Sequence, residues 1–308
     1  MAVAPHYTVL ALPLVPVSIN TAGQVAGTTP DYRAAIWSRR AGLRLLPLPE
    51  GFSSAESVAI NDSGRVIGMA YDNLSTRHQA FLFANNVLTL LGAEQARVYG
   101  IGEQNIVVGE SLVAGQNRTE PVLWNRGKLT ALPNCCGGAA KAINAHGEVI
   151  GDSYDEHGQY HAFLWSVARG ARNLGTRNGY SSAIAINDHG HVLIHAFSEV
   201  FLYAAGRLEP VRLSPHQSAQ PRSLNNCDVI VGSFGPYSDA ARAFIWERSR
   251  GFHDLNTRIA AGTGWKLEQA SQISDRGEIV GQGDFNGREN QGFLLVPAPA
   301  GPLNRFAE

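Results

Sequence analysis

Apolar and polar residues alternate in short runs along this chain, and paired runs are joined by a few turn-forming residues. One unit, VAINDSGRVIG (58–68), recurs as KAINAHGEVIG (141–151), IAINDHGHVLI (184–194) and SQISDRGEIVG (271–281). Looser copies are VSINTAGQVAG (17–27), YGIGEQNIVVG (99–109) and RSLNNCDVIVG (222–232). Strict alternation is typical of a half-buried strand, and the Gly, Asn or Asp at the centre of each unit tolerates the positive φ of a tight hairpin. Each unit therefore predicts two antiparallel strands, A and B.

The units recur at nearly constant spacing. The apolar residues that anchor them are Ile19, Ile60, Ile101, Ile143, Ile186, Leu224 and Ile273, which are 41, 41, 42, 43, 38 and 49 residues apart. A third run (AAIW, AFLF, PVLW, AFLW, VFLY, AFIW or GFLL) follows each unit and predicts strand C, and a weaker fourth run predicts strand D. Repeats of this length with four strands are typical of propeller blades. We expect an all-β fold in which residues 1–308 form a single seven-bladed propeller domain.

Only six D strands follow the seven C strands, so the last blade lacks one. YTVLALPL (7–14) is similar to LRLLPLP (43–49), which is a predicted D strand. We therefore expect the N-terminal strand to pair with GFLLV (292–296) and complete the last blade, leaving no open sheet edge around the ring. A β-sandwich or a solenoid of hairpins is the alternative, but seven equal units with a displaced end strand favour a ring.

The repeats resemble the HAF repeat family, predicted extracellular repeat proteins named after a His-Ala-Phe motif. The motif reads His161-Ala162-Phe163 in this chain, and residues 252–281 are the most specific match. The resemblance implies a propeller-like fold and supplies no catalytic residue. The N-terminal segment has no basic region and is interrupted by Pro13 and Pro16, and the three cysteines are too few and odd in number for a disulfide framework. We expect a cytoplasmic protein, or a secreted one if a leader was removed.

Composition narrows the class of partner. The net charge is −1, hydrophobic residues make up 44% and charged residues 17%, and no run of Lys or Arg forms a stripe. Nucleic acids and anionic membrane surfaces are therefore not expected partners. The sequence contains no glycine-rich phosphate loop, Cys-x-x-Cys pair or nucleophile elbow. A small-molecule ligand and no cofactor are expected.

Function is expected on the face of the ring that carries the B–C loops, because these loops differ between blades while the A–B turns are nearly identical. The first residue after the glycine that ends the strand B motif should point toward the channel mouth. In blades 3, 4 and 5 it is Glu110, Asp152 and His195, and in the last blade it is Gln282. Two carboxylates and an imidazole can act as acid and base, or hold a divalent cation. The alternative is that they are ordinary polar residues on a solvated rim.

Strand A should line the channel, and its variable positions supply further candidates. Tyr99, Lys141 and Arg222 lie two residues before their anchors, and Glu56 and Arg97 lie four before theirs. Because such groups are costly to bury unpaired, they should face the channel or one another. They form either a cradle for a polar or anionic ligand or an inter-blade ion-pair network. Cys135 precedes blade 4 on the same face, so a Cys135–His195 nucleophile is a weaker possibility.

These patterns predict a small-molecule-binding propeller with its site at the channel mouth. In the enzyme hypothesis Glu110, Asp152, His195 and Tyr99 carry cofactor-free acid–base chemistry, as in a hydrolase, lyase or cyclase. Glu56, Arg97, Lys141, Arg222, Gln282 and Cys135 then contact the substrate. The alternative is a non-catalytic propeller scaffold that binds a ligand or a protein through its variable loops.

Overall fold

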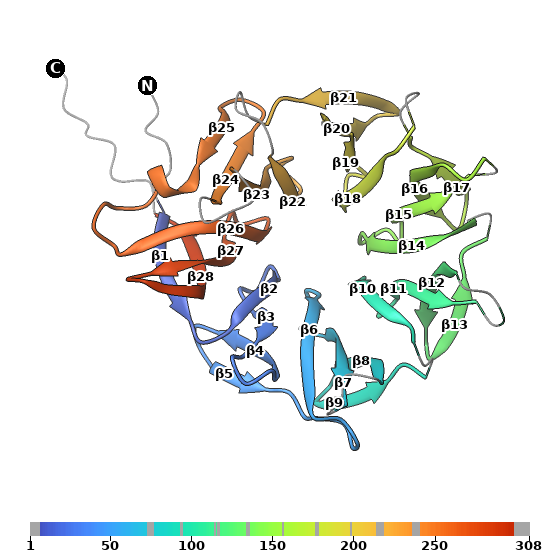
Figure 1. Cartoon of the computed structure of the whole chain (residues 1–308), viewed down its shortest axis with the longest axis horizontal. Helices are drawn as coiled ribbons and strands as arrows, with labels where there is room; N and C mark the ends of the chain where they lie inside the picture. Colours follow the sequence, from blue (N-terminus) through green and yellow to red (C-terminus); the bar gives the residue numbers. More distant parts are fainter. Residues whose placement is uncertain are drawn as a thin grey trace.

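The chain folds into a ring of seven β-sheets around a central axis (Figure 1). The computed structural model describes residues 7–72, 77–92, 95–113, 115, 118–133, 136–155, 157–175, 179–197, 199–213, 219–235 and 241–298. Each sheet has four strands, and neighbouring strands in each sheet are antiparallel. The predicted seven-bladed propeller of four-stranded antiparallel blades is confirmed.

The blades follow the order of the sequence repeats, and in each blade the strands succeed one another from the channel outward. Blades 1 to 4 are β2 (Val15–Ile19), β3 (Val25–Thr28), β4 (Ala34–Ser38), β5 (Gly42–Leu45); β6 (Ser54–Ile60), β7 (Val66–Tyr71), β8 (His78–Ala84), β9 (Val87–Leu90); β10 (Arg97–Ile101), β11 (Val107–Leu112), β12 (Thr119–Asn125), β13 (Lys128–Ala131); β14 (Cys136–Ile143), β15 (Val149–Tyr154), β16 (Tyr160–Ser166), β17 (Gly170–Asn173). Blades 5 to 7 are β18 (Ser182–Ile186), β19 (Val192–Ala196), β20 (Glu199–Ala204), β21 (Arg207–Val211); β22 (Gln220–Leu224), β23 (Ile230–Phe234), β24 (Arg242–Glu247), β25 (Gly251–Asp254); β26 (Trp265–Ile273), β27 (Ile279–Phe285), β28 (Arg288–Pro297), β1 (Tyr7–Leu12).

The N-terminal strand closes the ring. β1 pairs antiparallel with β28 over its whole length, from Tyr7 opposite Pro297 to Leu12 opposite Gly292. The backbone N–H of Tyr7 also donates to the carbonyl oxygen of Arg258 at 2.8 Å. The last blade is therefore built from both ends of the chain, as predicted, although the strand ends at Leu12 rather than at residue 14.

The A–B turns are tight hairpins whose backbone needs a left-handed residue. Four residues after the anchor, φ is 74° at Gly23, 62° at Asn105 and 57° at Asp228. These residue types adopt positive φ at little cost, which explains why the turn motif tolerates Asn and Asp in place of Gly. The turns thus have the conformation that the repeat predicted.

Each innermost strand contains a register shift at the position two residues before its anchor. The residues at the shift are Val17, Val58, Tyr99, Lys141, Ile184, Arg222 and Ser271, and all seven line the channel. A β-bulge changes the direction of a side chain and twists the strand locally. The same irregularity in every blade therefore turns one side chain per blade toward the axis.

The hydrophobic core lies between neighbouring blades. Phe81, Phe244 and Phe293 of the third strands are fully buried. Phe81 lies opposite Gly68 of β7, and a Cβ added at Gly68 would collide with the Phe81 ring. The glycine that ends the strand B motif therefore makes room for the aromatic ring on the neighbouring strand.

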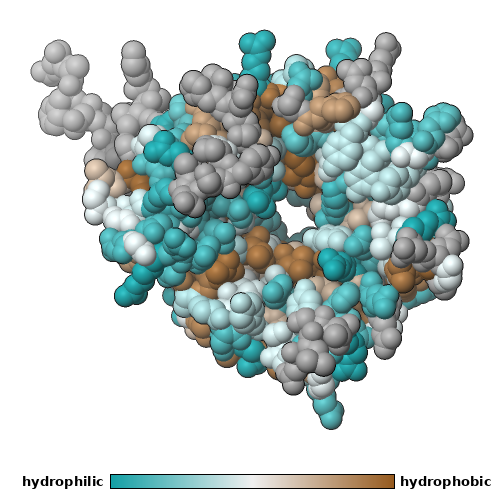
Figure 2. Space-filling model, viewed as in Figure 1, coloured by the Kyte–Doolittle hydropathy of each residue, from teal (hydrophilic) through white to brown (hydrophobic). Residues whose placement is uncertain are grey.

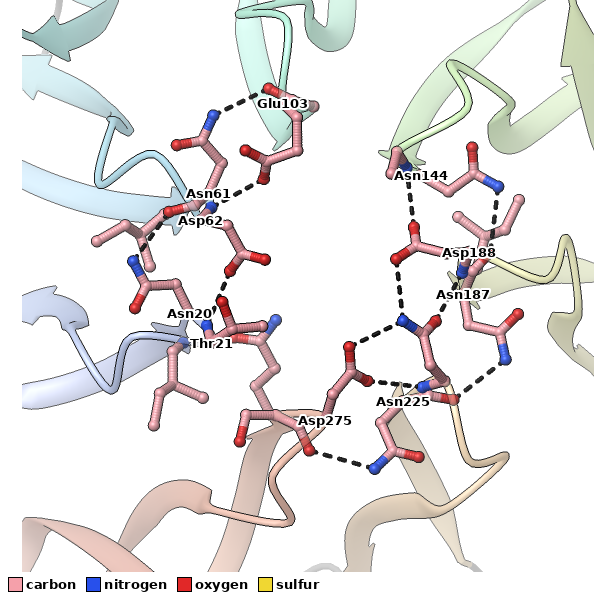
Figure 3. A pocket seen from close by; sticks show the side chains of 18 of the residues that line it. Asn20, Thr21, Asn61, Asp62, Glu103, Asn144, Asn187, Asp188, Asn225 and Asp275 are labelled. Atoms are coloured by element: carbon pink, nitrogen blue, oxygen red, sulfur yellow. Dashed lines mark hydrogen bonds between the residues drawn. The ribbon is translucent and has the colours of Figure 1, made fainter.

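A circle of hydrogen bonds joins the blades on the A–B turn face, and we call each bond an amide latch. In a latch, the side-chain amide nitrogen of the Asn after one anchor donates to the backbone oxygen of the equivalent residue in the next blade. The latches run from Asn20 to Asn61 (3.0 Å), Asn61 to Gly102 (3.0 Å), Asn144 to Asn187 (3.1 Å), Asn187 to Asn225 (3.1 Å) and Asn225 to Ser274 (3.2 Å). Figure 3 shows them as two arcs around the channel at the A–B turn face.

The two arcs are separated by gaps where the Asn is replaced. Gly102 stands in its place in blade 3 and Ser274 in blade 7, so neither residue has a side-chain amide to donate to the next blade. The chain itself crosses the second gap, because β1 completes blade 7 and leads directly into blade 1. Among the described residues, only the junction between blades 3 and 4 has neither an amide latch nor this closure.

Within the described residues, no helix is both long enough and apolar enough to cross a membrane.

Candidate functional site

The strand register places the predicted acid–base residues in one layer of the ring. Glu110 of β11 lies opposite Arg97, Asp152 of β15 lies opposite Ala139, and His195 of β19 lies opposite Ser182. Each of these positions is at the end of the blade that faces the B–C loops. The structure therefore brings the three residues to the same level, but their environments differ.

Glu110 is paired with a tyrosine of the channel wall. The Tyr99 hydroxyl donates to Oε1 of Glu110 at 2.8 Å. Burial, and then the hydrogen bond and negative charge of Glu110, raise the pKa of Tyr99 well above its usual value. Tyr99 is therefore a permanent donor at neutral pH, and it holds the Glu110 carboxylate at the border between the channel and the space outside it.

Asp152 is the centre of a buried hydrogen-bond network. Its side chain is 0% exposed and forms an ion pair with Lys141. Oδ2 also accepts from the Ser182 hydroxyl at 3.0 Å, and Oδ1 accepts from the backbone N–H of Ala183 at 2.8 Å. The hydroxyl of Tyr160 forms a further hydrogen bond with Asp152. Because Ser182 and Ala183 belong to β18, Asp152 attaches blade 4 to blade 5.

His195 lies beside this network without entering it. Its register partner is Ser182, which accepts a hydrogen bond from Lys141 Nζ at 2.7 Å. Burial lowers the pKa of His195, so the ring is neutral at pH 7. Among the described residues, no group of three His, Cys, Asp or Glu side chains is placed to hold a metal ion. Glu110, Asp152 and His195 do not form such a group.

The channel combines apolar and polar walls. A cavity of about 280 Å³ is lined by the bulged residues of the innermost strands, and Figure 2 shows an open hole at the ring axis. Tyr99 and Lys141 have the partners described above. Burial lowers the pKa of the Arg222 guanidinium, and within the described part of the chain Arg222 has no hydrogen-bond or ion-pair partner. Of Tyr99, Lys141 and Arg222, only Arg222 therefore lacks such a partner among the described residues.

The remaining predicted residues are more scattered. The charges of Glu56 and Arg97 both act on the Tyr71 hydroxyl, whose pKa is raised mainly by burial and then by Glu56. Both residues therefore lie within electrostatic reach of Tyr71, which ends β7. Gln282 lies opposite Gln269 in blade 7. Cys135 lies outside the described residues.

A larger pocket opens between blades 3 and 4, next to Glu110. Its volume is about 760 Å³, and it is lined by Glu110, Leu112, Arg118, Thr119, Gly137, Gly138, Ala139, Tyr154, Asp155, Gly158 and Tyr160. A Cβ on Gly138 would collide with the carbonyl oxygen of Asp152, so this wall is bare backbone. We call this space the inter-blade pocket. It lies outside the channel, where the sequence pattern did not predict a site.

The repeat pattern did not predict the tyrosines of this region. Tyr154 and Tyr160 line the inter-blade pocket, and Tyr180 stacks on Tyr160. The only signal for them in the sequence was composition. The loop after strand B of blade 4 reads SYDEHGQYH and has a tyrosine near each end. Position within the repeat could not have shown that a residue of the next crossing, Tyr180, joins them.

No protein-family model matches the chain, and no curated protein is similar enough to match it. Solved structures with the same fold include the WD40 β-propeller domain of Doa1, with 13% identity over 96% of this chain and 98% of that one and a TM-score of 0.57. TolB from Acinetobacter baumannii has 11% identity over 96% and 97% of the two chains and a TM-score of 0.50. The tricorn protease has 12% identity over 80% of this chain and 26% of its own, with a TM-score of 0.50. At these identities the likeness shows the propeller fold alone.

Proposed function

We propose that the protein binds a small polar molecule in the inter-blade pocket, on the face of the ring that carries the B–C loops. The observation that carries this proposal is the pocket of about 760 Å³ beside a carboxylate, Glu110, that Tyr99 holds in place. Ligand sites are commonly concave spaces of about 300–1,000 Å³ with a few convergent polar groups. The pocket is of this size and kind.

The walls of the pocket are fixed by the scaffold. On the blade 4 side, Asp155 accepts from the backbone N–H groups of His157 at 2.9 Å and Gln159 at 2.8 Å, and from His161 Nε2 at 3.0 Å. These bonds fix the turn that ends at Tyr160. A site whose supporting groups are already bonded loses little entropy when a ligand binds. This rigidity supports binding of a specific molecule.

The environment of the acid–base candidates favours binding over catalysis. Asp152 is buried and bonded to four partners, so it is not free to exchange protons with a ligand. Glu110 alone among the three lines the pocket. It can serve as a general acid or base, and this position supports a second candidate function, a cofactor-free hydrolase, lyase or cyclase. In that version Glu110 is the catalytic residue and Tyr99 positions it.

The resemblance to HAF repeats is also a proposal, and the position of the motif supports it. Ala162 and Phe163 are buried in β16, and His161 hydrogen-bonds Asp155. His161 thus attaches strand C to the turn before it, while Ala162 and Phe163 contribute to the core. This role is structural, in keeping with a resemblance that implies a fold and no catalytic residue.

The test uses a panel of sugars, amino acids, nucleosides and dicarboxylic acids, with thermal shift and native mass spectrometry as readouts. Leu112→Trp should fill the pocket, and Glu110→Gln should remove its carboxylate. Leu45→Trp is the matched control, since Leu112 and Leu45 are 42% and 45% exposed and Leu45 lies in blade 1. We expect at least one compound to bind the wild type and the Leu45→Trp variant, more weakly the Glu110→Gln variant, and not the Leu112→Trp variant.

Two outcomes would contradict the proposal. Either no compound of the panel binds the wild type, or a bound compound is unaffected by Leu112→Trp. Turnover separates the two candidate functions. A compound that the wild type converts, and that Glu110→Gln binds without converting, supports the enzyme, whereas binding without conversion by the wild type supports a binding protein.

A further inference from the structure

Three tyrosines form a row beside the inter-blade pocket. Tyr154 ends β15, Tyr160 begins β16, and Tyr180 lies in the crossing into blade 5. The rings of Tyr154 and Tyr160 meet edge to face with centroids 5.0 Å apart. Those of Tyr160 and Tyr180 are stacked at 5.6 Å with an interplanar angle of 16°. We call these residues the tyrosine row.

The row is both exposed and held in place. Tyr154 and Tyr180 are each 48% exposed, although large aromatic side chains usually bury most of their surface. Tyr160, between them, hydrogen-bonds Asp152 through its hydroxyl. Burial, and then the charge of Asp152, raise the pKa of Tyr160, which keeps the hydroxyl protonated as a donor. The buried network thus fixes the central ring, and the outer two present their surfaces to solvent.

The surroundings of the row are polar. Two of its members, Tyr154 and Tyr160, line the inter-blade pocket together with Glu110, Asp155 and Thr119. A ligand at this place meets aromatic surface together with carboxylate and hydroxyl oxygens. It must therefore have both an apolar face and hydroxyl groups that can donate hydrogen bonds.

We propose that the tyrosine row and the inter-blade pocket together bind a carbohydrate. The faces of aromatic rings carry partial negative charge, so they attract the weakly positive C–H groups on the face of a sugar ring. Hydroxyl groups of the sugar donate to the carboxylate of Glu110, and a site built for such bonds discriminates strongly against molecules that lack them. This inference rests on the proposed binding function and names its ligand class.

Other ligand classes fit the same residues less well. A quaternary ammonium ion is bound by rings that surround it, but these rings form a row, and Arg118 also lines the pocket. An anion would meet two carboxylates, Glu110 and Asp155, against one cation, Arg118. A flat aromatic molecule could stack on the row but would offer Glu110 no hydrogen-bond donor beyond the one it already has from Tyr99. These classes are alternative outcomes of the test.

The experiment measures retardation of the purified protein in native gels that contain a neutral polysaccharide, using xylan, laminarin and hydroxyethylcellulose in separate gels. Binding of the corresponding oligosaccharides is then measured by calorimetry. We expect retardation by at least one polymer. Tyr154→Ala and Tyr180→Ala should each weaken binding about tenfold, because each removes a ring face. Tyr154→Phe keeps the ring and should bind within about threefold of the wild type.

Tyr32→Ala is the matched control. Tyr32 is 63% exposed and lies between β3 and β4 in blade 1, so it is an exposed tyrosine on a B–C turn outside the tyrosine row. Its substitution should leave retardation unchanged. The inference is overturned if no polysaccharide or oligosaccharide binds, or if Tyr154→Ala and Tyr180→Ala bind as tightly as Tyr32→Ala. If a compound of another class binds and Leu112→Trp abolishes its binding, the proposed function stands while the carbohydrate inference fails. If nothing binds in the pocket, both fail.

Discussion

Replacement of Asp152 by alanine tests whether this residue is a structural anchor between blades 4 and 5 or a catalytic group. The substitution removes the acceptor of the Ala183 backbone N–H, the Ser182 hydroxyl and the Tyr160 hydroxyl, and the counter-charge of Lys141. Ala183 is buried, so its N–H cannot turn to water. We expect Asp152→Ala to lower the free energy of unfolding substantially, whatever the protein binds.

The magnitude follows from the separate contacts. A hydrogen bond from a buried backbone donor to a carboxylate contributes about 1.5–3 kcal/mol. The Lys141 side chain is 32% exposed, so water replaces part of its lost partner and its share is about 1 kcal/mol. The two hydroxyls can find other acceptors and add about 1 kcal/mol together. The expected loss is about 3.5–5 kcal/mol, in the range measured when one partner of a buried ion pair is removed.

The assay is urea unfolding followed by tryptophan fluorescence, with the melting temperature as a second readout. For a chain of 308 residues, the entropy of unfolding is about 0.6 kcal/mol per degree, so the melting temperature should fall by about 5–8 °C. Glu110→Gln is the control, because the Glu110–Tyr99 pair is partly exposed and should contribute less than about 1 kcal/mol. A loss for Asp152→Ala no greater than that of Glu110→Gln would refute the anchor role.

Three further predictions concern the ring and its pH dependence. Asn187→Ala removes the side-chain bonds to Asn225 O and Asp228 Oδ1 and the acceptor of two turn N–H groups. In urea unfolding it should lower the free energy of unfolding by about 2–4 kcal/mol, whereas the control Asn125→Ala, at an exposed position, should lower it by less than about 0.5 kcal/mol. Equal losses for the two variants would argue against the latch. Gly102→Asn should supply the missing amide latch between blades 3 and 4 and raise the urea midpoint by the equivalent of about 1 kcal/mol. An unchanged or lower midpoint would show that this junction lacks more than a side-chain amide. Burial lowers the pKa of His195 in the folded state, so as pH falls the imidazole is protonated first in the unfolded chain. The contribution of neutral His195 to the free energy of unfolding is therefore present above about pH 6.5 and is lost as pH falls toward the folded pKa. His195→Gln should flatten stability between about pH 7 and pH 5, and parallel wild-type and variant curves would contradict this.

The architecture was predictable because its signals are local. Alternating apolar and polar residues indicate a strand, a residue that accepts positive φ indicates a hairpin, and constant spacing indicates a repeat. Even the long-range pairing of β1 with β28 followed from counting, since six D strands cannot complete seven blades. The amide latches were equally visible as Asn20, Asn61, Asn144, Asn187 and Asn225 directly after their anchors. Their role could not be assigned without knowing how closely adjacent blades approach.

The sequence predicted at which height along the channel axis the candidate residues lie, but not which partners surround them. The position after strand B placed Glu110, Asp152 and His195 in one layer, because blades of equal register bring equal positions to equal heights. Which partners each residue meets depends on the neighbouring blade, as in the bond from Ala183 of blade 5 to Asp152 of blade 4. The stacking of Tyr180 on Tyr160 joins a crossing to a strand end, where the repeat no longer constrains the sequence.

The missing latch and the inter-blade pocket occur at the same place, the junction of blades 3 and 4. It lacks an amide latch at Gly102 on one face and contains the inter-blade pocket on the other. Across the rim of the pocket, the Thr119 hydroxyl donates to the carbonyl oxygen of Gly138 at 3.2 Å. A ligand that bonds Glu110 of blade 3 and packs on Tyr154 of blade 4 would add contacts between these two blades. Because a ligand that binds only the folded state stabilises it by about 2.7 kcal/mol at a hundredfold excess over Kd, this stabilisation should be absent in Leu112→Trp, whose pocket is filled.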